Sequence, residues 1–204
     1  AGDGRVAIPL SNAGIKVIAS EPHYAGAMTL AKNDVLVFHA DLSELKLKRS
    51  SVSALGIFDV LEHIEDVSEF LSEIHKILQP GALLYITVPA HQWLFSNHDL
   101  ALGHFKRYSR KSLISELRDY GFKPVEVRYF FASLILPAFL LRRVPYLLRK
   151  KGLDQKSGGP MEHGEESLTP PPAINRFMRS LLSVDSKLKL PFGLSLLGVF
   201  EKTS

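Results

Sequence analysis

Short apolar runs alternate with helical patterns over residues 6–88, and this alternation limits the folds that the chain can adopt. Strands that alternate with helices form a parallel sheet with right-handed crossovers, and such sheets bind ligands at the carboxyl ends of their strands. The expected strands are 17–20, 35–38, 52–58 and 82–88, and the expected helices are 6–13, 23–32 and 67–78. The pattern therefore predicts an α/β fold with a doubly wound, mostly parallel sheet.

Two glycines open the chain directly before the first expected helix. Gly2 and Gly4 are two positions apart, and Glu21 directly follows the strand expected at 17–20. Glycines let a ligand approach the backbone closely, and the amino terminus of a helix offers free N–H donors. An acid at a strand tip is placed to accept hydrogen bonds from ribose hydroxyls. Paired glycines are common in ordinary turns, but together with Glu21 they indicate a nucleotide-type ligand.

Charge is distributed unevenly along the 204 residues, whose formal net charge is +4. Residues 1–102 contain 7 basic and 12 acidic side chains, whereas residues 103–151 contain 12 basic and 3 acidic ones. Such a local excess of positive charge attracts phosphates or an anionic membrane surface. The alternative is a basic face that contacts only solvent. The chain has no cysteine, which excludes disulfides and thiolate chemistry.

The C-terminal half departs from the regular alternation. The apolar run 130–141 is followed by cations up to residue 151, and it is too short for the roughly 20 residues that span a bilayer. Further expected segments are a helix from Ser109 or Arg110, a strand at 124–131, a mobile linker at 152–172, an amphipathic segment at 174–188 and a last strand at 193–202. We therefore expect one domain over residues 1–204, with a helical insertion at 130–190.

Five motifs resemble those of the class I S-adenosylmethionine-dependent methyltransferases, in particular methyltransferases of types 11 and 12, and they occur in the order found in that family. They are Ala1-Gly2-Asp3-Gly4-Arg5, Glu21, Asp41-Leu42, Phe58-Asp59-Val60-Leu61-Glu62-His63-Ile64 and Leu78-Gln79-Pro80-Gly81-Ala82. The segments His98-Asp99, Gly103-His104, Arg107-Tyr108 and Pro191-Phe192-Gly193 resemble a subgroup associated with glycan or lipid-linked saccharide assembly. The resemblance implies the Rossmann-like class I fold. No signal peptide is visible, and because the chain begins inside the glycine motif, we expect upstream residues and the first strand to be missing.

The resemblance also implies a cofactor, S-adenosylmethionine, which becomes S-adenosylhomocysteine. Its binding residues would be Gly2, Asp3, Gly4, Glu21, Pro22, Asp41, Leu42, Phe58, Asp59 and His63. Glu21 would bind the ribose hydroxyls, and Asp41 would accept from the adenine amino group. Alternatively, Asp59 and Glu62 are a helix-start pair favoured by the helix dipole, and His63 is a core imidazole. Ser53 departs from the family pattern, which often has aspartate at that position.

The irregular segment 90–110 is expected to form a substrate lid. The candidate catalytic residues are His104, His98, Asp99, Arg107 and Tyr108, with His104 as the first choice of base and His98 as the second. The alternative is a hydrogen-bonded fastening of the loop. The spacing H-D-x4-H is not a standard zinc pattern, so we expect no metal.

The motifs together predict methyl transfer to a small-molecule or lipid-linked saccharide acceptor in the cytoplasm. We expect no nucleic-acid partner. Peripheral contact with the inner membrane face and a homodimer are alternatives for the apolar run 130–141. Two other classes stay open: a non-catalytic binding module of the same fold, attached to a membrane or a protein partner, and a nicotinamide dehydrogenase. The third glycine that a dehydrogenase motif requires is missing.

Overall fold

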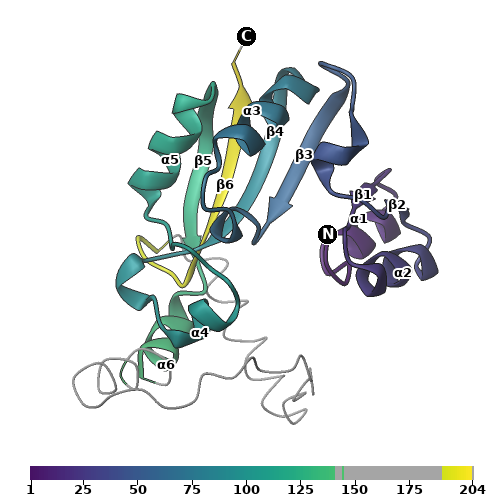
Figure 1. The fold of residues 1–204 in the computed structure, drawn as a ribbon. Helices are drawn as coiled ribbons and strands as arrows, with labels where there is room; N and C mark the ends of the chain where they lie inside the picture. Colours follow the sequence, from purple (N-terminus) through teal and green to yellow (C-terminus); the bar gives the residue numbers. More distant parts are fainter. Residues whose placement is uncertain (141–143, 145–189, 204) are drawn as a thin grey trace.

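The computed structural model describes residues 1–140, 144 and 190–203 (Figure 1). The expected linker at 152–172, the amphipathic segment at 174–188 and nearly all of the cationic run after residue 141 lie outside the described residues. All the strands expected from the sequence fall within the described ranges.

The strands form two sheets. β1 (Ile18–Ser20) and β2 (Leu36–Phe38) form a parallel pair. The second sheet has the order β3-β4-β6-β5, with β3 (Val52–Phe58), β4 (Leu78–Pro89), β5 (Phe122–Phe130) and β6 (Ser195–Lys202). β3 and β4 are parallel, whereas β6 runs antiparallel to both β4 and β5. The expected strands are all present, and the larger sheet is mixed because its last strand enters between β4 and β5.

Helices α3 (Ser68–Ile77) and α5 (Arg110–Asp119) lie against the larger sheet (Figure 1). α3 buries Leu71, Ile74 and Ile77, whose spacing places them on one face of the helix. Leu71 and Ile74 meet alternate residues of β4, such as Leu84, in a single apolar core. On the opposite face of the same strand, Tyr85 is partly exposed. This one-sided pattern explains why β4 alternates between buried and accessible residues.

Local signals set the ends of several elements. The Asp66 carboxylate accepts a hydrogen bond from the Ser68 amide at the start of α3. Ser109 precedes α5, and its side chain accepts from the Ser112 amide. β4 begins at Leu78 and runs through the Pro80-Gly81 turn, so the strand starts earlier than the expected Ala82.

The glycine turn, α1 (Ala7–Asn12) and α2 (Tyr24–Lys32) pack with β1 and β2 around a smaller core. Leu30 of α2 is fully buried there, beside Ala19 and Val35. The remaining helices and single turns are η1 (Leu42–Leu45), η2 (Leu61–His63), η3 (Gln92–Leu94), α4 (Asn97–Ala101), η4 (Ala132–Leu134) and α6 (Ile135–Ala138). Of these, η2 follows β3, and η3 and α4 follow β4, so they lie beyond the carboxyl ends of two parallel strands.

The helices of the described residues are short. The longest of them, α3 and α5, have 10 residues each, against the roughly 20 that span a bilayer. Among the described residues, no helix combines the length and the apolar character that crossing a bilayer requires.

Candidate active site

Glu21 is buried at the carboxyl end of β1, with 3% of its surface exposed. Its Oε2 accepts hydrogen bonds from the Gly2 amide and the Ala1 amino group, and its Oε1 accepts from the His23 amide at 2.9 Å. Gly2 and Gly4 have φ angles of +58° and +82°, a backbone region that favours glycine. The carboxylate therefore lies directly against the glycine turn.

Gly26 in α2 makes a close contact that the sequence did not predict. A Cβ at this position would lie 2.7 Å from the Gly2 carbonyl oxygen and 3.0 Å from Cγ of Glu21. Only a residue without a side chain lets α2 approach the glycine turn this closely. Glycine is unfavourable inside a helix, so its presence in α2 is the signal that could have indicated this close approach.

The other residues expected at the cofactor are distributed over turns. Asp3 is exposed and pairs with Arg5, and the Pro22 carbonyl lies 2.9 Å from Nε2 of His39. Asp41 caps η1 and is exposed, whereas Leu42 is half-buried. The carboxylates of Asp3 and Asp41 are therefore exposed to solvent, the first in the glycine turn and the second after β2.

Phe58 ends β3, and Asp59 directly follows it. Asp59 has a φ angle of +52°, which turns the chain sharply, and its Oδ1 accepts from the Thr87 hydroxyl of β4 at 3.2 Å. The kink directs the following residues, including Glu62 and His63 of η2, away from the strand. The residues of η2 therefore follow the carboxyl end of β3.

Asp99 is the centre of the loop between β4 and α5. Its Oδ1 accepts from Nε of Arg107 at 2.7 Å and lies 3.1 Å from Nδ1 of His104. Its Oδ2 accepts from the Ser96 amide and hydroxyl, at 2.9 Å and 3.1 Å. Burial raises the pKa of Asp99, but the hydrogen bond and charge of Arg107, together with hydrogen bonds from His104 and Ser96, outweigh burial and lower this pKa. Asp99 is thus a buried carboxylate that organises the loop.

Arg107 and Tyr108 fasten the same loop to the sheet. Nη1 of Arg107 donates to the Ala90 carbonyl at 3.2 Å, and the Tyr108 amide donates to Pro89 at 2.9 Å. Burial and the neighbouring Glu116 carboxylate raise the pKa of Tyr108, which is 2% exposed. Both side chains are directed into the protein, whereas His98 is exposed. The geometry agrees with the fastening alternative for Arg107 and Tyr108.

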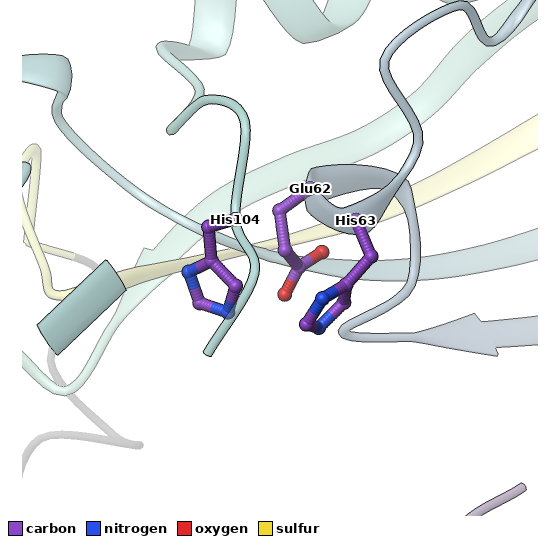
Figure 2. Close-up of side chains that lie close together, drawn as sticks. All are labelled: Glu62, His63 and His104. Carbon is purple, nitrogen blue, oxygen red and sulfur yellow. The ribbon is translucent and has the colours of Figure 1, made fainter. Parts of the chain in front are cut away.

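The structure brings Glu62, His63 and His104 together (Figure 2). One potential ligand atom from each residue lies within 4.8 Å of the others, and the two imidazole rings meet edge to face at 4.7 Å between centroids. The Phe105 amide donates to the Glu62 carbonyl at 2.8 Å, which ties the two chain segments together. Sequence reasoning placed His63 with the cofactor and His104 with the acceptor, and it did not join Glu62 to either.

Burial changes the titration of this cluster. Glu62 is 1% exposed, and burial, with the charge of Asp59 adding to it, raises its pKa to about 8. Burial also lowers the pKa of His63, and the nearby His104 lowers it further. Perturbed groups that converge at the end of parallel strands are typical of a functional site.

The sequence matches a known protein family over more than half of its length. The family model described as "Methyltransferase domain" matches residues 1–127. The chain belongs to this methyltransferase-domain family. The match covers the glycine turn, Glu21 and the whole loop with Asp99 and His104, and it confirms the family that the motifs predicted. The more specific saccharide-assembly subgroup stays a prediction.

Curated relatives and solved structures extend the comparison. A probable S-adenosylmethionine-dependent methyltransferase of Mycolicibacterium smegmatis is 30% identical over 87 residues, 42% of this chain and 34% of that protein. The chain thus matches about a third of the length of this relative. A SAM-dependent methyltransferase structure from Archaeoglobus fulgidus has a TM-score of 0.62 and 16% identity, over 98% of this chain and 82% of that one. The structure of the [4+2]-cyclase SpnF has a TM-score of 0.58 and 15% identity, over 99% of this chain and 72% of that one. These likenesses confirm the α/β fold class.

Proposed function

We propose that this chain is the S-adenosylmethionine-binding part of a methyltransferase and transfers a methyl group to a small-molecule or lipid-linked saccharide acceptor. The observation that carries the proposal is the buried Glu21 carboxylate at the end of β1, held against the glycine turn. A carboxylate in that place suits a ribose diol, because it only accepts hydrogen bonds and the diol donates two. The methyltransferase-domain match over residues 1–127 supports the same assignment.

The residues present fit such a cofactor. The close approach of Gly26 to Gly2 keeps the turn free of side chains, and Asp41 at the next strand tip is exposed and able to accept from an adenine amino group. Phe58 and Asp59 would line the methionine end. When bound, S-adenosylmethionine supplies a sulfonium-activated methyl group, so the protein's task is to align the acceptor.

The loop between β4 and α5 is proposed to hold the acceptor. His104 is the residue that we assign to contact it, with His98 as an exposed second candidate on the same loop. Asp99 and Arg107 are positioning residues, because their buried ion pair fixes the ring of His104. Tyr108 has the same role through the backbone hydrogen bond that its amide donates to Pro89 of β4.

Exposed apolar side chains around this loop favour an acceptor with a lipid or other apolar part. Trp93 lies 5.9 Å from Phe139 beside α6, measured between ring centroids, and it is itself half exposed. Other exposed apolar residues of the two segments are Leu100, Leu102, Phe105, Leu136 and Leu140. Peripheral contact with an anionic membrane is part of this proposal, and its basis is the charge excess of residues 103–151.

A non-catalytic or non-methylating protein of the same fold is the second candidate. The likeness to the [4+2]-cyclase SpnF supports keeping it, because that structure shares the fold under a name for different chemistry. A transfer assay with radiolabelled methyl donor and a panel of lipid-linked and free saccharides separates the two candidates. Label in an acceptor supports the methyltransferase, and cofactor binding without transfer to any member favours the second candidate.

Calorimetric titration with S-adenosylhomocysteine, and with NAD as the comparison, tests the cofactor assignment. We expect binding of the first alone. Glu21→Ala should weaken it by about 1–3 kcal/mol, because charged hydrogen bonds to the ribose are lost. Glu69→Ala, which removes an exposed acid from α3, is the matched control and should bind as the parent chain does. An unchanged titration of the Glu21 variant would contradict the assignment.

A further inference from the structure

Glu62, His63 and His104 form a cluster in which two nitrogen ligands and one carboxylate meet. Glu62 and His63 come from η2 after β3, and His104 comes from the loop after α4, so the fold and not the sequence joins them. Figure 2 shows the two imidazole rings on either side of the Glu62 carboxylate. Two histidines and one carboxylate are a recurring ligand set for divalent transition metals.

His104 is prepared for the role of a ligand. Its Nδ1 is 3.1 Å from Oδ1 of Asp99, a carboxylate oxygen that also accepts from Nε of Arg107, so Nδ1 is placed to donate to Asp99. The other ring nitrogen, Nε2, then has a lone pair and is directed toward Glu62 and His63 (Figure 2). A carboxylate that orients a histidine in this way is the usual support behind a metal ligand.

The buried carboxylate of Glu62 independently points to a bound cation. Its side chain is 1% exposed, and among the described residues no group forms a hydrogen bond with its Oε2. A buried carboxylate oxygen without a partner is costly, and the cost is removed by a proton or by a cation.

We propose that Glu62, His63 and His104 bind one divalent transition-metal cation of the zinc type. Ligand bonds of about 2.1 Å in tetrahedral geometry place ligand atoms about 3.4 Å apart, so atoms that now lie within 4.8 Å must approach by up to about 1.4 Å on binding. Two nitrogen ligands favour such a cation over calcium or magnesium. Three protein ligands leave coordination positions open, which is the arrangement of a catalytic and not of a structural site.

The cation site deepens the proposed function and rests on it for its role. An acceptor hydroxyl in an open position would be held in place and made more acidic, with its proton passing to solvent. The acceptor class is therefore an alcohol, and His104 is a ligand instead of the general base expected from the sequence. The spacing H-D-x4-H still does not describe the site, because Asp99 is occupied by Arg107 and His98 is not a member of the cluster.

Cation binding is measurable without any methyl acceptor. Tag-free chain, stripped with a chelator, is titrated with Zn²⁺ by calorimetry and with Co²⁺ by visible absorption. We expect one site per chain and the visible bands of a nitrogen-ligated Co²⁺ ion. His63→Ala, His104→Ala and Glu62→Gln should each weaken binding at least tenfold. His98→Ala is the matched control on the same loop and should leave the affinity unchanged.

Three outcomes overturn the cation site: no binding by the parent chain, unchanged binding by all three ligand variants, or equal loss in His98→Ala. Far-ultraviolet circular dichroism of each variant identifies loss of fold, and Asp99→Glu, which retains the charge, serves as a milder second variant. It should lower the Co²⁺ affinity by about 10-fold through its effect on the His104 ring. Titration with S-adenosylhomocysteine is run in parallel: binding of that ligand without a cation refutes this inference alone, and binding of a cation without that ligand refutes the proposed cofactor.

Discussion

Oδ1 of Asp99 lies 2.7 Å from Nε of Arg107 and 3.1 Å from Nδ1 of His104, so one buried oxygen orients two cationic or polar side chains. The side chains of Asp99 and Arg107 are 0% and 5% exposed. A buried pair of this kind is sensitive to loss of one member, because the other charge is then left without a partner.

Asp99→Asn should destabilise the chain by about 3–5 kcal/mol, since the Arg107 guanidinium would remain buried and uncompensated. Urea unfolding gives the free energy, and Arg107→Gln with the double variant completes a cycle. The double variant should be more stable than the sum of the two single effects predicts. A single Asp99→Asn variant within about 1 kcal/mol of the parent, or strict additivity, would show that the pair is not coupled.

Gly26→Ala should weaken binding of S-adenosylhomocysteine and lower stability. Alanine in the middle of a helix normally adds up to about 1 kcal/mol of stability over glycine, so a loss reverses the usual sign. The reason is the new methyl group, which would lie 2.7 Å from the Gly2 carbonyl oxygen. Thermal unfolding and calorimetry measure the two effects. An increase in stability at unchanged affinity would mean that α2 does not need this close approach.

His75 should make the chain less stable as the pH falls. Burial and the Lys202 ammonium lower its pKa from 6.5, while a hydrogen bond with the Thr203 backbone opposes the shift, and its ring meets Phe122 edge to face. Above about pH 6.5 the imidazole is neutral in both states, and below it the unfolded chain binds the proton more readily, so stability is lost. Urea midpoints at about pH 8 and about pH 5.5 should differ less for His75→Gln than for the parent. Equal pH dependence in both would assign the effect to other groups.

The segment around α6 should bind anionic membranes. Leu136 and Leu140 are 64% and 53% exposed, and the sequence continues with cations at 142, 143 and 149–151. An apolar face with nearby cations binds at the interface, and each cation adds about 1 kcal/mol near an anionic leaflet. Flotation should retain the chain on anionic vesicles at low salt and release it at high salt. Leu136→Ser with Leu140→Ser should reduce retention. If the parent chain stays in solution with anionic vesicles at low salt, the apolar run serves packing instead.

Periodicity and turn residues made most of the fold predictable. The spacing of Leu71, Ile74 and Ile77 predicted α3, and the run at 52–58 matches β3 without change, because both signals are local. The place of β6 in the sheet was not predictable in the same way. It depends on where in the sheet a distant strand inserts, and the position of β6 between β4 and β5 is set by long-range pairing such as Ile86 with Gly198.

The same distinction between local signals and long-range contacts applies to the site. The sequence by itself determined the family, the glycine turn and the acid at the end of β1, since each is a short motif whose chemistry is carried by adjacent residues or by one strand tip. Only the tertiary structure decided that Asp99 binds Arg107 and His104, and that Glu62 and His63 approach His104 from another segment. The physical reason is that these contacts join groups from different elements, and burial of the Glu62 side chain, which changes its chemistry, exists only after the chain has folded.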